Sequence, residues 1–251
     1  MRIPNGMRDF AGATLGQLPV RVRAGAARGA RWTLFPWTSY WKGTHEPAMQ
    51  AAVESLGDIS GWACWDLGAH FGLYSVALAL RTGPTGEVAA FEPNPGSFGR
   101  LQRHARMNGL SWLKAHECAV SDEVGRSQLL NNGDKGTTSA HLLYDGEDAA
   151  AAGKGLGIRT VRLDDEVEAG RLRAPQFIKV DVEGHGHRAL RGMARTLSRA
   201  RPQLIVALHS DAEARGVLAV LDPLGYSREA VGAPPDSTSL IGADYWFRPL
   251  G

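Results

Sequence analysis

The stretch Trp62 to Ser75, WACWDLGAHFGLYS, constrains the fold more than any other part of the chain. An apolar run ends in Asp66, the chain turns through Gly68, Ala69 and Gly72, and an apolar-periodic segment follows. A strand, a glycine turn and a helix in this order form the first βα unit of a nucleotide-binding sheet. Gly68 lets the chain leave the strand sharply, and Gly72 removes a Cβ where the helix approaches the strand or a ligand. The start of the helix offers free N–H groups to that ligand.

The spacing of the turn indicates which ligand it holds. A dinucleotide fingerprint reads G-x-G-x-x-G, whereas this turn reads Asp-x-Gly-x-x-x-Gly with His70 inside it. A carboxylate at the strand end suits a cationic amine better than a pyrophosphate. The acidic residue that binds ribose is expected about 20 residues further on, and Glu92 ends the next strand, Glu87 to Phe91. An amine and a ribose together predict S-adenosylmethionine; the alternative is an ordinary βαβ unit without a ligand.

Composition narrows the class of protein. The chain has 251 residues, enough for one large α/β domain with an arm, and a formal net charge of +2. Neither nucleic acid nor an acidic membrane surface is therefore expected as a partner. No secretory signal and no run of about 18 apolar residues is seen, so no membrane span is expected. Cys64 and Cys118 lie in strand-like runs, which predicts two buried free thiols and a cytoplasmic protein.

Two regions flank or interrupt the main pattern. Residues 1–45 are expected to form an N-terminal arm, and 46–251 a catalytic domain with an insertion at about 125–160. The arm carries an aromatic segment from Trp32 to Trp41. It is interpreted either as the wall or lid of an acceptor pocket, or as packing against the sheet or a homodimer contact. The insertion is either a substrate lid or a plain surface loop.

The remaining pattern alternates strands and helices. A helix is expected from Pro47 with Thr44 or His45 near its cap. Other expected elements are helices over 96–108 and 188–197, strands over 113–120, 158–163, 176–182 and 203–208, and an antiparallel hairpin around 226 and 245–248. The core strands then end in Asp66, Glu92, Ser121-Asp122, Asp181 and His209. If these strands are parallel, the residues share the edge where ligands bind.

Two loops at this edge add predicted cofactor contacts. Pro93 and Asn94 make a stiff turn beside the ribose-binding carboxylate, although a plain β–α turn has the same composition. Ala119, Val120 and Ser121 are candidates for the adenine end. A helix cap or turn is the alternative for the serine.

The motifs DLGAHFGLYS, AFEPNP, AVSD and FIKVDVEG, followed by Leu-x-Gly, resemble the FkbM family of S-adenosylmethionine-dependent methyltransferases. The similarity runs from about Gly43 to about His209. It implies the class I Rossmann-like fold, an α/β fold with a doubly wound, mostly parallel sheet. The expected antiparallel hairpin would form one edge of that sheet. The similarity also implies methylation of oxygen in secondary metabolites or sugars.

The resemblance also implies roles for single residues. Gly68 and Gly72 would shape the cofactor turn, Glu92 would hold the ribose, and Glu46 would contact the methionine part. Asp181 would lie where cofactor and acceptor meet. The full set of predicted cofactor contacts is Glu46, Asp66, Gly68, Ala69, His70, Gly72, Glu92, Pro93, Asn94, Ala119, Val120, Ser121 and Asp181.

One position departs from the family pattern. The family reads D-V-E-G-x-E, and here Gly186 stands in place of the second Glu. His185 or His187 is a candidate to take over its task.

An alcohol acceptor needs a base to take its proton. His209 or His185 is the candidate, with Asp181 orienting the histidine or the acceptor, although a histidine at a strand end is often only packed there. A divalent metal on Asp181, His209 and Asp211 is an alternative that the sequence does not favour, because a dedicated ligand spacing is missing. No metal ligand is therefore predicted.

The predicted function is O-methylation of a hydroxylated small molecule. N-methylation of an amine by the same fold is the first alternative. A non-catalytic module that binds the cofactor or a protein partner is the second.

Overall fold

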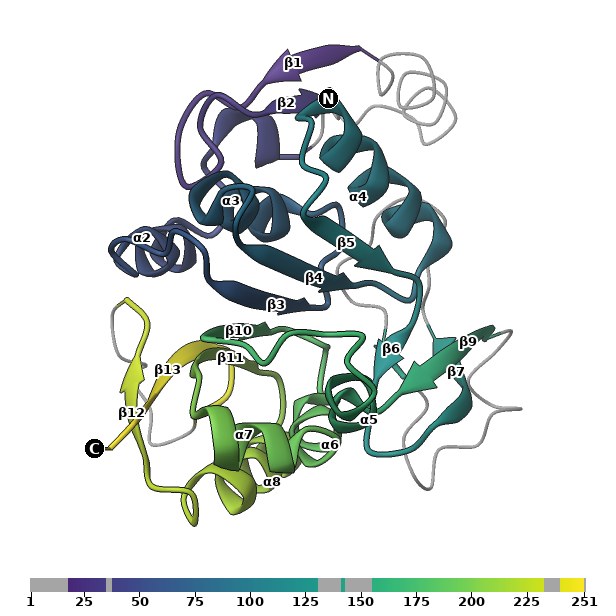
Figure 1. Ribbon diagram of the computed structural model, residues 1–251, viewed down its shortest axis with the longest axis vertical. Coiled ribbons are helices and arrows are strands. Elements are labelled where there is room, and N and C mark those ends of the chain that lie inside the picture. Colours follow the sequence, from purple (N-terminus) through teal and green to yellow (C-terminus); the bar gives the residue numbers. More distant parts are fainter. Residues whose placement is uncertain (1–17, 35–37, 131–140, 143–154, 233–239, 251) are drawn as a thin grey trace, which may run out of the picture.

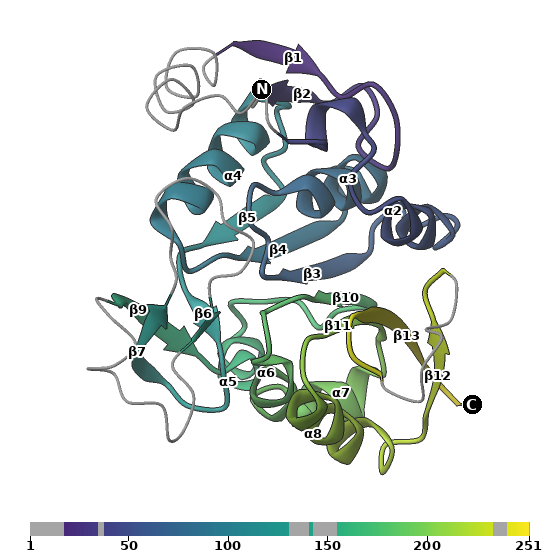
Figure 2. The same ribbon diagram turned by 180° about the vertical axis from the view of Figure 1, so that it is seen from behind.

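The computed structural model describes residues 18–34, 38–130, 141–142, 155–232 and 240–250 (Figure 1). The expected flexible arm at 1–16 and the glycine-rich loop at 131–139 lie outside these residues. A central sheet has helices on both of its faces, as Figures 1 and 2 show from opposite sides. This three-layer arrangement is the one expected for alternating strands and helices.

The central sheet has seven strands in the order β12 (Tyr226–Ala230), β13 (Ala243–Pro249), β11 (Gln203–Leu208), β10 (Phe177–Val180), β3 (Ala63–Leu67), β4 (Glu87–Phe91) and β5 (Leu113–His116). The strands from β11 to β5 are parallel, whereas β13 runs antiparallel to β11 and to β12. This confirms the predicted doubly wound sheet with its antiparallel edge hairpin. The chain order reverses between β3 and β10, which is the switch point where such sheets bind ligands.

Helices cover the sheet in two groups (Figure 1). One face carries α2 (Pro47–Glu54), α3 (Leu73–Thr82) and α4 (Pro95–Met107), and the other carries α5 (Leu163–Glu168), α6 (Gly186–Arg191), α7 (Ala194–Ala200) and α8 (Asp211–Leu221). Successive residues of a strand point to opposite faces. Cys64 accordingly packs in one core cluster and Trp65 in the other. All five residues of β3 are buried, as a strand covered on both faces requires.

Three boundaries differ from the sequence-based expectation. The predicted third strand over 113–120 is wrong, because β5 ends at His116 and Ala119–Val120 forms β6 in a separate sheet. The predicted helix over 188–197 is two helices that break near Gly192, where a Cβ would lie 2.0 Å from the Ser121 carbonyl oxygen. The N-cap of α2 is Glu46 rather than Thr44 or His45.

The expected insertion contains a small second sheet. Its strands follow the order β6, β9 (Leu156–Val161), β7 (Gly125–Leu130) and β8 (His141–Leu142). It lies beside the main sheet near the ends of α5 and α6 (Figures 1 and 2). Ala119, Leu129 and Ile158 form a small core of their own within it.

The described part of the N-terminal arm packs on a helix of the main sheet. Strands β1 (Pro19–Arg21) and β2 (Arg31–Thr33) pair, and β2 lies against α4. Trp32 is 1% exposed and stacks on His104 with ring centroids 3.6 Å apart. For this tryptophan the packing interpretation is confirmed. Phe35 and Trp37 of the aromatic segment lie outside the described residues.

Two further expectations concern the chain as a whole. Cys64 and Cys118 are free and buried, as predicted. Burial raises the pKa of the Cys64 thiol to about 12 and that of Cys118 to about 11. Among the described residues, no helix combines the length and apolar character needed to cross a membrane.

Candidate active site

A cavity of about 410 Å³ opens at the carboxyl ends of the parallel strands. This volume is within the range of small-molecule sites. Most of the predicted site residues line it: Glu46, Gly68, Ala69, His70, Glu92, Pro93, Asn94, Ala119, Val120, Asp181, His185 and His209. Asp66, Gly72 and Ser121 are not among its lining residues. Of the residues that the sequence placed at one sheet edge, Glu92, Asp181 and His209 line the cavity, whereas Asp66, Ser121 and Asp122 do not.

The glycine turn has two different tasks. Gly68 has φ +76°, and a Cβ on it would lie 1.8 Å from the Asp181 carbonyl oxygen. Only glycine allows the turn to pass so close to the neighbouring strand end. A Cβ on Gly72 would instead lie 2.4 Å from Leu101 Cδ1 on α4. Gly72 thus leaves room for Leu101 of α4 at the start of α3.

Glu92 is a fixed, buried carboxylate. Its Oε2 accepts the N–H of His70 at 2.7 Å, and its Oε1 accepts the N–H of Asn94 at 2.8 Å. Each oxygen keeps a second lone pair for a ligand. Burial raises the pKa of Glu92 to about 7, although these hydrogen bonds lower it. Asn94 also caps α4 by accepting the N–H groups of Gly96 and Ser97.

A second group of polar side chains lines the cavity where the chain enters α2. Glu46 has φ +42°, and its Oε2 accepts the Tyr74 hydroxyl at 2.8 Å. His45 Nε2 lies 3.3 Å from the other carboxylate oxygen. Tyr40, from the aromatic segment, lines the cavity, and its hydroxyl lies 3.0 Å from His70 Nδ1. The pocket-wall interpretation therefore holds for Tyr40.

Lys179 is a buried cation that sequence reasoning missed. It is 2% exposed, and its Nζ lies 3.6 Å from Asp66 Oδ1 and 3.3 Å from Asp181 Oδ2. Asp66 also accepts the Ser75 hydroxyl at 2.5 Å, so this carboxylate serves the core. A lysine within an otherwise apolar strand, Phe177–Val180, was the available signal.

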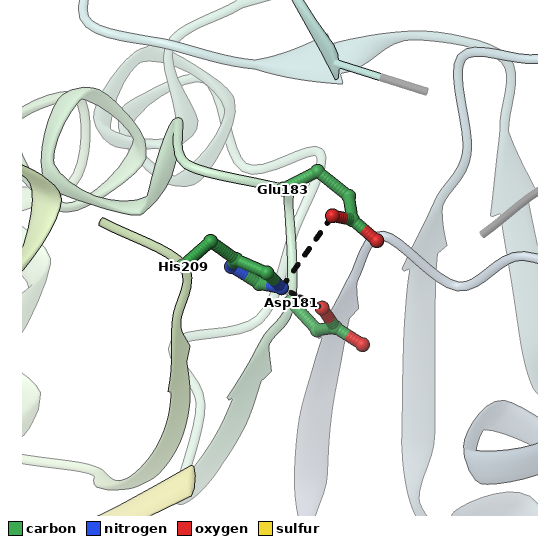
Figure 3. A group of neighbouring side chains, drawn as sticks. All are labelled: Asp181, Glu183 and His209. Carbon is green, nitrogen blue, oxygen red and sulfur yellow. Dashed lines mark ion pairs between the residues drawn. The ribbon is translucent and has the colours of Figure 1, made fainter. Parts of the chain in front are cut away.

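His209 and the acidic residues after β10 form a compact group (Figure 3). His209 Nε2 lies 3.4 Å from Asp181 Oδ1 and 3.6 Å from Glu183 Oε2. Burial alone would lower the pKa of His209, but Asp181, Glu213 and Glu183 raise it to about 10. Burial would likewise raise the pKa of Asp181, but Lys179 and His209 hold it below its usual range.

The same three residues each offer one ligand atom, and these atoms lie within 4.8 Å of one another. Asp181, Glu183 and His209 are thus close enough to share a metal ion. Asp211, which the sequence suggested as a third ligand, does not belong to this group.

The two histidines after Gly184 have different surroundings. His185 is 3% exposed and lines the cavity, and its Nε2 lies 3.0 Å from Ser121 Oγ. Burial lowers its pKa to about 4. His187 instead packs against α8, where a Cβ on Gly216 would lie 2.6 Å from its own Cβ. Of these two candidates for the task of the family's Glu, only His185 reaches the cavity.

The space beside Gly186 holds a carboxylate that sequence reasoning missed. Glu213 of α8 is fully buried, and its Oε1 accepts the Gly186 N–H at 2.8 Å. The available signal was the spacing Ser210-x-x-Glu213, which is typical of a helix cap.

The far end of the cavity lies at the edge hairpin. Gly242, Ala243 and Asp244 line it together with Ala207 and Leu208 of β11. Burial raises the pKa of Asp244 to about 6, with contributions from Asp181 and Glu46.

Known proteins provide independent comparisons. The family model described as the methyltransferase FkbM domain matches residues 66–228. The hexuronic acid methyltransferase AglP of Haloferax volcanii is 27% identical over 178 residues, which cover 71% of this chain and 69% of that protein. A methyltransferase 1 of Beauveria bassiana is 26% identical over 51% of this chain and 57% of its own length.

A solved structure shows the same fold. The methyltransferase FkbM of Methylobacillus flagellatus superposes with a TM-score of 0.51 at 21% sequence identity. The match covers 77% of this chain and 45% of that chain, so this protein spans less than half of that structure.

Proposed function

The chain belongs to the FkbM methyltransferase family, and from that premise we propose that it transfers a methyl group from S-adenosylmethionine to a hydroxyl of a sugar-like small molecule. The observation that carries this proposal is one cavity lined both by Glu92, which follows β4, and by the Asp181–His209 pair, which follows β10 and β11. The similarity to a hexuronic acid methyltransferase supports an acidic sugar as the first acceptor to test.

The residues present fit the two halves of S-adenosylmethionine. Glu92 keeps lone pairs for ribose hydroxyls, and Ala119 and Val120 offer apolar contact for the adenine ring. Glu46 and Asp181 supply negative charge for the amino group of the methionine part. When bound, the cofactor supplies a methyl group on a positively charged sulfur, which keeps the electron pair of the broken bond. The chain would position the acceptor oxygen against that methyl group, a main source of catalysis in such reactions.

We assign the base to His209. Its Nε2 faces the cavity beside Asp181, where an acceptor hydroxyl would pass its proton to the ring. The ring carries a proton of its own at neutral pH because its pKa is raised to about 10. Only the neutral ring is a base, so we expect kcat/KM to rise with pH, and the positive charge of the cofactor to shift this rise downward.

A second candidate function is N-methylation. Asp181, Glu183 and Asp244 surround the acceptor end, and three carboxylates would attract an ammonium group.

The test is a panel of acceptors with methyl-labelled S-adenosylmethionine. It contains glucuronic and galacturonic acid glycosides, their neutral sugars and the matching amino sugars, with label transfer read by mass spectrometry. Methylation at oxygen that falls at least a hundredfold in His209→Ala, with unchanged S-adenosylhomocysteine binding, supports the proposal. Transfer to the amino sugars alone would replace it with the N-methylation alternative.

A chelator distinguishes two roles of His209, that of a base and that of a metal ligand. We expect activity to survive EDTA, because the imidazole itself lies between the two carboxylates at ion-pair distance. Activity that is lost with EDTA and returns with Mg²⁺ or Mn²⁺ would assign Asp181, Glu183 and His209 to a metal ion instead.

A further inference from the structure

Helix α8 sends one fully buried carboxylate, that of Glu213, to the ends of two neighbouring strands. Its Oε1 accepts the N–H of Gly186 at 2.8 Å, and its Oε2 accepts the N–H of His209 at 2.8 Å. The same Oε2 lies 3.4 Å from His209 Nδ1. One carboxylate thus joins the segment after β10 to the end of β11. It also faces the side of the imidazole opposite to Asp181.

Two glycines allow this approach. A Cβ on Gly186 of α6 would lie 2.7 Å from Glu213 Oε1, a distance that real Cβ atoms do not show. A Cβ on Gly216 of α8 would lie 2.6 Å from His187 Cβ. The missing side chains let α6 and α8 come close enough for the carboxylate to reach the strand ends.

A helix cap explains only part of these contacts. Ser210 Oγ accepts the Glu213 N–H at 3.1 Å, as the first half of a capping box does. In a capping box the Glu then reaches back to the N-cap residue. Here the carboxylate accepts N–H groups from His209, one residue before the cap, and from Gly186 on another helix. These contacts therefore fix the backbone at the edge of the cavity more than they cap the helix.

We propose that Glu213 is the positioning residue for His209, and that Gly186 admits its carboxylate to that place. This inference rests on the proposed role of His209 as the base. The charge of Glu213 lies at ion-pair distance from Nδ1, without a hydrogen bond to it, and favours a proton on that nitrogen. Nε2 is then the nitrogen that exchanges its proton in the cavity. Glu213 does not line the cavity, so it acts through the ring and not on the acceptor.

Several charged side chains surround the His209 ring, and a test must separate the effect of Glu213 from the effects of the others. The charged side chains facing His209 are Asp181 and Glu183 after β10, Glu213 of α8, Asp244 of β13, and Lys179 behind Asp181. Glu213 is the member of this set that stands at Nδ1. Removal of the Glu213 charge should therefore change the tautomer of the neutral ring. Loss of one of the other charges should leave the tautomer unchanged.

The experiment is ¹⁵N NMR of the His209 ring in the full chain with S-adenosylhomocysteine bound. In Glu213→Gln we expect the ring to titrate about 1–3 pH units lower. Above its pKa, where the ring is neutral, we expect the Nδ1 proton signal to be lost. Gly186→Ala, which pushes the carboxylate aside, should show the same changes in smaller measure. Ser210→Ala is the matched control, because it weakens the cap of α8 and should lower the melting temperature without changing the ring signals.

The outcomes separate this inference from the proposed function. A ring that keeps its Nδ1 proton and its titration in both Glu213→Gln and Gly186→Ala would overturn the role of Glu213. A changed ring with unchanged kcat would support Glu213 as the positioning residue and remove His209 as the base. The expected result is a changed ring with kcat lowered at least tenfold at the high-pH plateau, where the ring is neutral in both proteins, and with cofactor binding within threefold of the wild type.

Discussion

The carboxylate of Glu92 shows how one side chain is made ready for a ligand. Two backbone N–H groups, those of His70 and Asn94, fix its oxygens before any ligand arrives. A group held in this way loses little entropy on binding. Its burial also places its pKa near neutrality, so its charge depends on pH within the working range.

Binding of S-adenosylhomocysteine should therefore weaken in acid. The ionised carboxylate accepts ribose hydroxyls, so we expect the Kd to rise about tenfold for each pH unit below 7 and to level off above it. Calorimetric titration between pH 5.5 and 8.5 measures this. Glu92→Gln should bind about a hundredfold more weakly at pH 8 and without this pH dependence. Glu87→Gln, at the start of the same strand, is the control and should bind like the wild type.

Lys179 matters for stability as well as for charge at the site. Lys179→Met leaves Asp66 and Asp181 without their buried cation, and we expect a loss of about 3–5 kcal/mol in the free energy of unfolding. Lys114→Met removes an exposed lysine from its pair with Glu87, which keeps the Arg173 N–H as a partner, and should cost clearly less. Urea denaturation of both variants compares them. Equal losses would show that the buried lysine has no special role.

At the scale of elements, the glycine turn after β3 is the tightest constraint. Its predicted place was right because the pattern is local: a buried strand, a glycine and a periodic helix. The neighbour that demands the glycine was not predictable, because the Asp181 carbonyl comes from β10, more than a hundred residues later. Glu213 was missed for the same reason, since its contact with Gly186 depends on the packing of two helices.

Two glycine variants separate backbone conformation from contact. Gly68→Ala and Gly83→Ala both place a side chain at positive φ, but only the first meets a neighbour, at 1.8 Å. Nothing lies within 4 Å of a Cβ on Gly83. We expect Gly83→Ala to cost about 1–3 kcal/mol and Gly68→Ala to lose both the folded cavity and S-adenosylhomocysteine binding. Circular dichroism melting and calorimetry measure the two effects; similar behaviour of both variants would contradict the assigned contact.

At the scale of the whole molecule, the sequence predicted the central sheet but neither the small second sheet nor the packing of the arm. The parallel strands and the edge hairpin followed from local patterns and the rules of parallel sheets. The break between β5 and β6 was missed because one strand-like run of residues can serve two sheets, and no local signal marks the change. For the arm, the sequence left a pocket wall and packing against the sheet open, and its aromatic residues decide its packing.

Trp32 tests whether the arm belongs to the folded core. Its buried ring stacks on His104 of α4, so we expect Trp32→Ala to lower the free energy of unfolding by about 3–5 kcal/mol. Trp41→Ala removes a ring that is only partly buried and should cost clearly less. Thermal unfolding of both variants compares them. A Trp32→Ala protein with an unchanged melting temperature would show that the arm is held elsewhere. The homodimer predicted for this segment would have to use residues other than Trp32 and Tyr40, which are both buried.

The pairing of β3 with β10 also bears on how the protein is made by the ribosome. Cys64 pairs with Phe177, 113 residues later in the chain. At about 5–20 residues per second, translation needs roughly 6–23 s to supply that partner. During this time one edge of a strand that is buried in the finished protein waits unpaired, which is the kind of edge that recruits other chains. The nascent protein should therefore depend on chaperones until residue 180 has emerged, and its half-made forms should be the aggregation-prone ones.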